Sequence, residues 1–245
     1  MKRNEYDLCI INLRRPSLVI TIMFFTIGAW VAGVVGVLGL ITFLVPFLFY
    51  QCLRPQDLKK KYDAKWAIVT GGSSGIGRAI SEKCCKQGIS VIIVAVPDEL
   101  LPNSVKELRR DYPNVEVVPV GVDLSKPGYM EAVAAETKDR DIQLLFCNAG
   151  FMKTGFFADV PIGAWRANSA VNVGCHIDLS HEYINRMIKK QKRGCVVFTS
   201  SPASMLPSPF STMYGATKVA FCNVSLISNN FVSGFCDRIC CWSCG

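Results

Sequence analysis

No Asp, Glu, Lys or Arg occurs between Pro16 and Leu53, and this run constrains the fold more than any other feature of the chain. Its apolar centre, residues 17–50, consists mainly of Val, Leu, Ile, Phe and Gly. A bilayer core of about 30 Å needs roughly 20 apolar residues in a helix, so this segment is long enough to span it. A signal peptide has an apolar core of only about 7–15 residues, and a buried soluble helix is rarely this long. We therefore predict a transmembrane segment at residues 17–50.

Basic residues flank this segment on both sides, within a chain whose net charge is +8. Arg14 and Arg15 precede it, and Arg54 and residues 59–61 follow it. Such residues normally mark the cytoplasmic side of a membrane segment and contact anionic headgroups. We therefore interpret residues 1–16 as a basic flank and residues 51–64 as a basic linker to a cytosolic part. No basic stripe continues beyond them, so a nucleic-acid partner is not expected.

Two arrangements of the apolar segment are open. One straight helix over residues 17–50 would be about 51 Å long, roughly 20 Å more than the hydrocarbon thickness. Either one span crosses the bilayer and the rest lies in the interface, or the segment folds back at its central glycines as a hairpin. The hairpin would return both basic flanks to the cytosol, but each limb would be at the lower length limit for a span. We expect the single span.

After the linker, strand-like and helix-like segments alternate. The strands are apolar on both faces, as parallel strands covered by helices tend to be. Strands are predicted at residues 65–70, 90–96, 115–122, 142–147 and 194–199, and helices at residues 79–87, 98–110, 126–138 and 167–191. This order predicts an α/β fold, a Rossmann-like doubly wound parallel sheet. We assign it to residues 65–221.

The first predicted strand leads directly into a glycine-rich loop, Thr70-Gly-Gly-Ser-Ser-Gly-Ile-Gly77. Glycines allow a tight turn and let backbone N–H groups approach a pyrophosphate, which then lies at the positive end of the following helix. The position between a strand and a helix is the context that supports this interpretation. The candidate dinucleotide-binding residues of this loop are Gly71, Ser73, Ser74, Gly75, Ile76, Gly77 and Arg78.

Together with later motifs, this loop resembles the short-chain dehydrogenase/reductase family. The resemblance implies that Asp123 holds the adenine ring and that Asn148-Ala149-Gly150 borders the cofactor. It also implies a catalytic set of Asn172, Ser201, Tyr214 and Lys218. Ser201 is preferred to its neighbour Ser200 because it lies thirteen positions before the tyrosine, the usual spacing in the family.

The implied roles have physical reasons. Lys218 follows Tyr214 by one helical turn, so both side chains face the same way and the ammonium stabilises the phenolate. Lys218 would also reach the nicotinamide ribose, which adds both residues to the cofactor-binding set. Ser201 would donate to the substrate carbonyl oxygen, where negative charge grows. Asn172 would hold a water that relays protons from Lys218 to solvent.

The choice of cofactor is less directly encoded. An NAD-binding member usually has an acidic residue at the end of the second strand, and an NADP-binding member often has an Arg there. Here Ala95-Val96-Pro97 occupies that place and Asp98 follows. Arg78, just past the glycine loop, could either meet a 2′-phosphate or be a solvated residue of the first helical turn. We expect NADPH, with NADH as the alternative, because the membrane reductases that the chain resembles use NADPH.

A membrane segment directly before the glycine loop is similar to two lipid-pathway branches of the family. These are the very-long-chain 3-oxoacyl-CoA reductases, with their 17β-hydroxysteroid dehydrogenase relatives, and the 3-ketodihydrosphingosine reductases. The resemblance implies a lipid-like ketone substrate and an endoplasmic reticulum location with the catalytic part toward the cytosol. It leaves the choice between the branches open, and a homodimer is a possible assembly.

The resemblance ends near residue 221. Family members continue with a sixth strand, a Pro-Gly motif, substrate-binding helices and a seventh strand, whereas residues 222–245 are short and Cys-rich. Cys241 and Cys244 form a CxxC pair with no second pair and no nearby His, so no metal site is expected. We expect a C-terminally truncated domain. The alternative to a lipid ketone reductase is an inactive membrane-bound remnant that at most binds dinucleotide.

Overall fold

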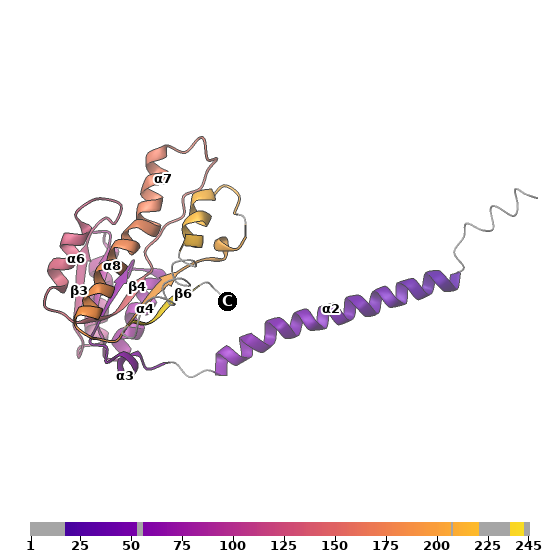
Figure 1. Cartoon of the computed structure of the whole chain (residues 1–245), viewed down its shortest axis with the longest axis horizontal. Coiled ribbons are helices and arrows are strands. Elements are labelled where there is room, and N and C mark those ends of the chain that lie inside the picture. The colour runs from indigo at the N-terminus through magenta and orange to yellow at the C-terminus, as the bar shows by residue number, and fades with distance from the viewer. Residues whose placement is uncertain (1–17, 53–55, 207, 221–235, 243–245) are drawn as a thin grey trace, which may run out of the picture. The chain divides into compact units, whose positions relative to one another are not determined.

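The computed structural model describes residues 18–52, 56–206, 208–220 and 236–242 and divides into two units after Pro55 (Figure 1). The predicted flank at residues 1–16 lies outside the described residues, as does most of the tail at residues 222–245.

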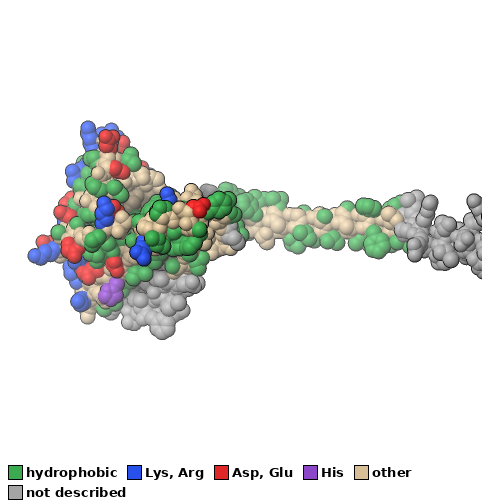
Figure 2. All heavy atoms as spheres, turned by 90° about the horizontal axis from the view of Figure 1, so that it is seen from above, with side chains coloured by type: hydrophobic (Ala, Val, Ile, Leu, Met, Phe, Trp, Pro, Cys, Tyr) green, Lys and Arg blue, Asp and Glu red, His purple; other side chains and the backbone are tan. Residues whose placement is uncertain are grey.

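The described part of the first unit is helix α2, Leu18–Cys52. Its segment Ile20–Phe49 has a mean hydropathy of 2.5, and none of it is buried. Figure 2 shows hydrophobic side chains along this helix and no acidic or basic ones. By length and composition the helix is sufficient to cross a membrane.

Helix α2 is continuous through its four glycines and through Pro46, in contrast to the hairpin alternative. Glycine costs a helix about 1 kcal/mol relative to alanine and proline costs more. A continuous helix nevertheless satisfies most backbone groups internally, which is the stronger requirement in an apolar environment. The structure therefore agrees with a single helical segment of 35 residues, about 52 Å long.

The second unit is an α/β domain around one parallel sheet with the strand order β3-β2-β1-β4-β5-β6. The strands are β1 Trp66–Thr70, β2 Ser90–Ala95, β3 Val117–Gly121, β4 Ile142–Cys147, β5 Gly194–Thr199 and β6 Cys236–Trp242. The helices are α3 Leu58–Tyr62, α4 Gly75–Lys86, α5 Leu100–Asp111, α6 Tyr129–Thr137, α7 Ile162–Ser169, the π-helical turn η1 Ala170–Gly174, α8 Cys175–Lys189, the short 3-10 turn η2 Pro202–Ser204 and a helix over residues 212–220. The predicted Rossmann-like sheet is confirmed.

Helices cover both faces of this sheet, and each face has its own apolar core (Figure 1). On one face, α4 and α5 contribute Cys84, Val105 and Leu108. On the other, α6 and α8 contribute side chains that include Leu179 and Tyr183. Burial on both faces explains why the strands are continuous apolar runs. Each fully buried aliphatic side chain contributes roughly 1.5–3 kcal/mol, so the two cores hold the strand ends in place.

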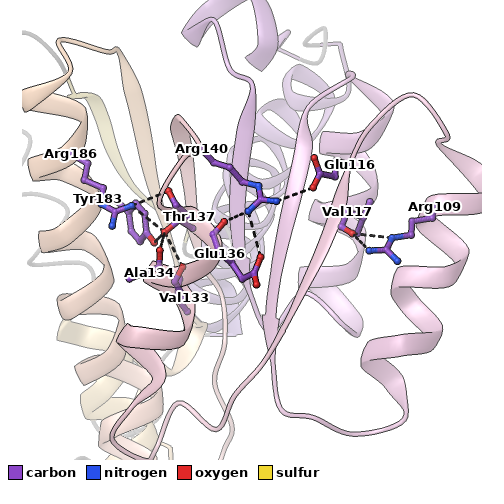
Figure 3. Close-up of polar contacts among 10 residues, drawn as sticks. All are labelled: Arg109, Glu116, Val117, Val133, Ala134, Glu136, Thr137, Arg140, Tyr183 and Arg186. Atoms are coloured by element: carbon purple, nitrogen blue, oxygen red, sulfur yellow. Dashed lines mark hydrogen bonds and ion pairs between the residues drawn. The ribbon is translucent and has the colours of Figure 1, made fainter.

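Polar contacts fix the helices on the sheet (Figure 3). The hydroxyls of Thr137 and Tyr183 lie 2.7 Å apart and join α6 to α8, and the Arg186 guanidinium donates to the Thr137 carbonyl at 3.2 Å. On the opposite face, Arg109 donates to the carbonyl of Val117 at 2.7 Å and joins α5 to β3.

Two predicted helices differ from the observed ones. Helix α4 begins at Gly75, four residues before the predicted Ala79, so the end of the glycine loop is already helical. The single helix predicted for residues 167–191 is instead α7, η1 and α8, and it begins at Ile162 directly after Pro161. The pattern could not show the π-helical turn because one inserted residue hardly changes apolar spacing.

The expectation that the tail supplies no sixth strand is wrong. Residues Cys236–Trp242 form β6, which pairs in parallel with β5. An open sheet edge presents unpaired N–H and C=O groups, so a segment that reaches it gains hydrogen bonds to the edge strand. The unusual composition of the tail concealed this strand.

The predicted linker contains α3, which packs onto the end of α4. The side chain of Gln87 accepts a hydrogen bond from the Leu58 backbone at 2.8 Å, and Lys59 donates to the Gly88 carbonyl at 2.8 Å. Tyr62 is buried in the same core as α4. These contacts make residues 58–62 part of the α/β unit.

Candidate active site

A cleft opens beyond the carboxyl ends of β1, β4 and β5, the edge where ligands bind in open α/β sheets. It is lined by Gly71, Ser74, Ile76, Asn148, Ala149, Gly150, Phe151, Met152, Thr199, Ser200, Ser201, Pro202, Tyr214 and Lys218. Four motifs that are far apart in the sequence therefore meet in one place.

The glycine loop forms one wall of the cleft. Gly71 has φ +66°, and a side chain there would lie 3.0 Å from the backbone of Ala149. Gly77 is packed even more tightly against the Gly71 carbonyl. Gly75 differs from both, because its φ of +54° requires glycine while a side chain would meet nothing within 4 Å. A cradle that a Cβ would fill, at the N-terminus of a helix, suits the pyrophosphate of a dinucleotide.

The hydroxyl of Thr70 holds the opposite wall in place. It accepts hydrogen bonds from the backbone N–H groups of Asn148 and Ala149 at 2.9 and 3.0 Å. The Asn148 side chain in turn accepts from the Thr199 hydroxyl at 3.1 Å. These bonds connect the ends of β1, β4 and β5, so the Asn-Ala-Gly loop is fixed relative to the glycine loop.

Tyr214 and Lys218 lie one turn apart on the helix over residues 212–220. Lys218 Nζ is 5.5 Å from the centroid of the Tyr214 ring and donates to the main-chain carbonyl of Thr199 at 2.9 Å. Lys218 is only 4% exposed. A buried ammonium in a fixed position beside the phenol stabilises negative charge on the phenol oxygen.

The two neighbouring serines have different surroundings. Ser200 is buried, and its hydroxyl donates to the main-chain carbonyl of Lys218 at 3.0 Å. The Ser201 hydroxyl accepts from the backbone N–H of Ala203 at 3.3 Å. A hydroxyl that accepts a bond still carries a proton that it can donate. This difference is in line with Ser201 as the residue that meets a substrate and Ser200 as a support for the helix.

Asn172 lies behind the cleft, fully buried in the π-helical turn. Its side-chain oxygen accepts from the backbone of Phe151 at 3.0 Å. Its amide donates to the carbonyl of the same residue at 3.1 Å and to the Thr217 hydroxyl at 3.2 Å. The side chain therefore braces the loop after β4 against the Tyr214 helix, and the water-holding role stays a prediction.

Several predicted binding residues lie outside the lining of the cleft. Arg78 forms ion pairs with Glu82 at 3.6 Å and with Glu107 at 3.3 Å. Asp123 accepts from the Ser125 hydroxyl at 2.6 Å, and this bond lowers the pKa of its carboxyl. Asp98 accepts from two backbone N–H groups at the start of α5. Ser73, Gly75 and Gly77 form the loop without lining the cleft.

Sequence reasoning missed part of the lining and of its support. Phe151, Met152 and Pro202 line the cleft because each follows a strand that ends there. Their position shortly after a predicted strand was the signal that could have identified them. Thr217, which contacts Asn172 from 45 residues away, is brought to it by the packing of a separate helix and gave no local signal. His176 follows Asn172 by one helical turn, and its contact with Thr70 gave no local signal.

Comparison with known proteins gives the same picture. A family model described as short chain dehydrogenase matches residues 65–227. A 7beta-hydroxysteroid dehydrogenase of Collinsella aerofaciens is 33% identical, over 66% of this chain and 60% of its own length. A very-long-chain 3-oxoacyl-CoA reductase of Laccaria bicolor is 29% identical, over 77% of this chain and 57% of its own.

Solved structures show the same similarity. A short-chain dehydrogenase from Sphingobium yanoikuyae in complex with NADPH has a TM-score of 0.64 and 26% identity, over 69% of this chain and 66% of that one. The chain spans about three fifths of the length of the curated relatives it matches. Sheet order, cleft and family match agree, and the chain belongs to the short-chain dehydrogenase family.

Proposed function

We propose that this chain is an NADPH-dependent reductase of a ketone on a lipid-type substrate, anchored in the endoplasmic reticulum membrane with its α/β unit in the cytosol. One observation carries the proposal: Tyr214, Lys218 and Ser201 line the same cleft as the glycine and Asn-Ala-Gly loops. A proton donor, a hydroxyl and a dinucleotide cradle are thereby within one site.

The chain's own groups supply proton transfer and charge stabilisation. The Tyr214 phenol would donate its proton to the substrate carbonyl oxygen while the Ser201 hydroxyl donates a hydrogen bond to the same atom. The buried ammonium of Lys218 offsets the negative charge that Tyr214 acquires. Bound NADPH would supply the hydride that the carbonyl carbon receives.

The residues present fit a dinucleotide. Gly71, Ser74 and Asn148 line the cleft beside the N-terminus of α4, which favours an anionic pyrophosphate. We propose NADPH rather than NADH in line with the membrane reductases that the chain resembles. Arg78 forms ion pairs with two glutamates, which would compete with a 2′-phosphate for its guanidinium.

The membrane location and the substrate class rest on two observations. Helix α2 is apolar over Ile20–Phe49, and a very-long-chain 3-oxoacyl-CoA reductase is among the similar proteins. A lipid-like ketone partitions into the membrane, so an anchored enzyme would meet it at high local concentration.

The test is NADPH oxidation by the full chain in microsomes, with a long-chain 3-oxoacyl-CoA, 3-ketosphinganine and a steroid ketone offered separately. Turnover of one of them that Tyr214→Phe abolishes would support the proposal. NADPH binding without turnover of any substrate would instead favour the dinucleotide-binding remnant. Reduction of water-soluble ketones alone would contradict the substrate class.

A further inference from the structure

A buried histidine lies between the cofactor loop and the catalytic turn. His176 is at the start of α8 and is 0% exposed. Its Nε2 is 3.0 Å from the hydroxyl oxygen of Thr70 at the end of β1. Its Nδ1 is 3.4 Å from the main-chain carbonyl oxygen of Asn172 in η1. The imidazole thus connects two elements that carry different motifs of the site.

The hydrogen bonds of the Thr70 hydroxyl determine which ring nitrogen of His176 is protonated. The hydroxyl oxygen already accepts from the N–H groups of Asn148 and Ala149, which occupy both of its lone pairs. Its single proton has two acceptors in reach, His176 Nε2 at 3.0 Å and the Phe146 carbonyl at 3.2 Å. A third donor from His176 would overload the oxygen, so Nε2 must accept.

The same assignment suits the other nitrogen. With Nε2 as acceptor, neutral His176 carries its hydrogen on Nδ1 and donates it to the Asn172 carbonyl. The opposite tautomer would direct the Nδ1 lone pair at that carbonyl oxygen. One chain of hydrogen bonds then runs from the Asn-Ala-Gly backbone through Thr70 and His176 to Asn172.

We propose that His176, as the neutral Nδ1–H tautomer, is a positioning residue that holds the π-helical turn of Asn172 in register with Thr70 and the cofactor loop. As a role in cofactor binding the proposal rests on the proposed function, whereas the tautomer is a property of the fold. Burial keeps the ring neutral by lowering the pKa of His176 to about 3, and the nearby Lys218 ammonium acts in the same direction.

The first experiment needs no substitution in the site. The chain has two histidines, His176 and the exposed His181 on the same helix, so a ¹⁵N-histidine-labelled full chain in detergent gives two imidazole spin systems. Long-range ¹H–¹⁵N spectra identify the protonated nitrogen, and His181→Gln assigns the signals. We expect His176 to show the Nδ1–H form and no titration between about pH 5 and pH 8.

The second experiment measures whether the contact matters for the cofactor. His176→Phe keeps an aromatic ring without either polar contact and should weaken NADPH binding roughly tenfold, as expected for the loss of a buried hydrogen-bond network. His176→Gln, whose amide oxygen can accept from Thr70, should restore most of the affinity. His181→Phe is the matched control and should leave affinity unchanged.

Each outcome decides between alternatives. An Nε2–H or charged His176 at neutral pH would overturn the proposal, and so would equal NADPH affinity in His176→Phe and the unmodified chain. If the unmodified chain binds no NADPH, the proposed function fails, while the tautomer still tests the hydrogen-bond chain. Misfolding of His176→Phe would leave the spectra of the unmodified chain as the deciding measurement.

Discussion

The side-chain amide of Asn172 donates a hydrogen bond to the hydroxyl of Thr217, 3.2 Å away and 45 residues later in the chain. The Thr217 hydroxyl donates in turn to the carbonyl of Tyr214 at 2.7 Å. The π-helical turn is therefore bonded directly to the helix that carries Tyr214 and Lys218. Through Phe151, Asn172 also holds the loop that borders the cleft.

Replacement of Thr217 tests this bracing. Thr217 is buried, so Thr217→Val leaves an amide N–H of Asn172 without its acceptor and should cost about 1–3 kcal/mol of stability. Denaturant unfolding of the detergent-solubilised chain measures the loss. Thr212→Val, at an exposed position of the same helix, is the control. Equal stability of the two variants would show that the bond contributes nothing.

Substitution of Gly75 tests whether a side chain in the glycine loop obstructs the cofactor, apart from any effect of backbone strain. Gly75→Leu should abolish NADPH binding because its side chain would project into the open space of the loop. Gly128→Leu is a matched control, since Gly128 also has a positive φ and open space around it but precedes α6 and is not part of the glycine loop. Fluorescence titration with NADPH compares the two. Unchanged NADPH affinity in Gly75→Leu would refute the cradle.

Substitutions of Tyr214 and Lys218 should have different effects on ketone reduction and on NADPH affinity. Tyr214→Phe removes the proton donor and should reduce ketone reduction at least roughly 100-fold, with NADPH affinity nearly unchanged. Lys218→Ala should lower both, because the ammonium serves the phenol and the proposed ribose contact. Tyr112→Phe, on α5's C-terminal side, controls for loss of a phenol elsewhere. A Tyr214→Phe protein that keeps most of its kcat would exclude the proton-donor role.

Stability should depend on pH through His176. Burial lowers its pKa to about 3 in the folded chain, against about 6.5 in an unfolded one. Between these values the unfolded state binds the additional proton, so stability is complete above about pH 6.5 and declines as the pH falls. The decline approaches 1.4 kcal/mol per pH unit at most. Unfolding midpoints are measured at about pH 7 and pH 5. The difference between the two midpoints should shrink in His176→Gln and remain in His181→Gln. An equal difference in both variants would assign the pH dependence to other groups.

The orientation of α2 in the membrane can be determined by labelling a cysteine that the chain already contains. A single span with a cytosolic α/β unit places Cys9 in the lumen, so a membrane-impermeant maleimide should modify it only after sealed microsomes are permeabilised. Lys60→Cys, on the exposed surface of α3, provides the cytosolic control and should react in intact vesicles. Peptide mass analysis distinguishes the two sites. Modification of Cys9 in intact vesicles would exclude this orientation and favour a fold-back.

Features that depend on neighbours in the chain could be predicted from the sequence. The alternation of strands and helices and the Tyr214–Lys218 pair follow from local patterns, because strand burial sets apolar continuity and one helical turn sets a spacing of four. The glycine loop is local in the same way. The five predicted strands were therefore correct with small shifts at their ends, whereas the sixth strand and the π-helical turn were not predicted.

Only the tertiary structure decided which distant residues each motif contacts. Arg78 meets Glu107 because α4 packs beside α5, and this contact occupies the side chain expected to face a 2′-phosphate. Thr70 meets His176 because the fold brings the start of α8 to the end of β1, so this histidine becomes a buried link between them. Such partners are separated by 29 to 106 residues, and their proximity is set by core packing rather than by any spacing along the chain.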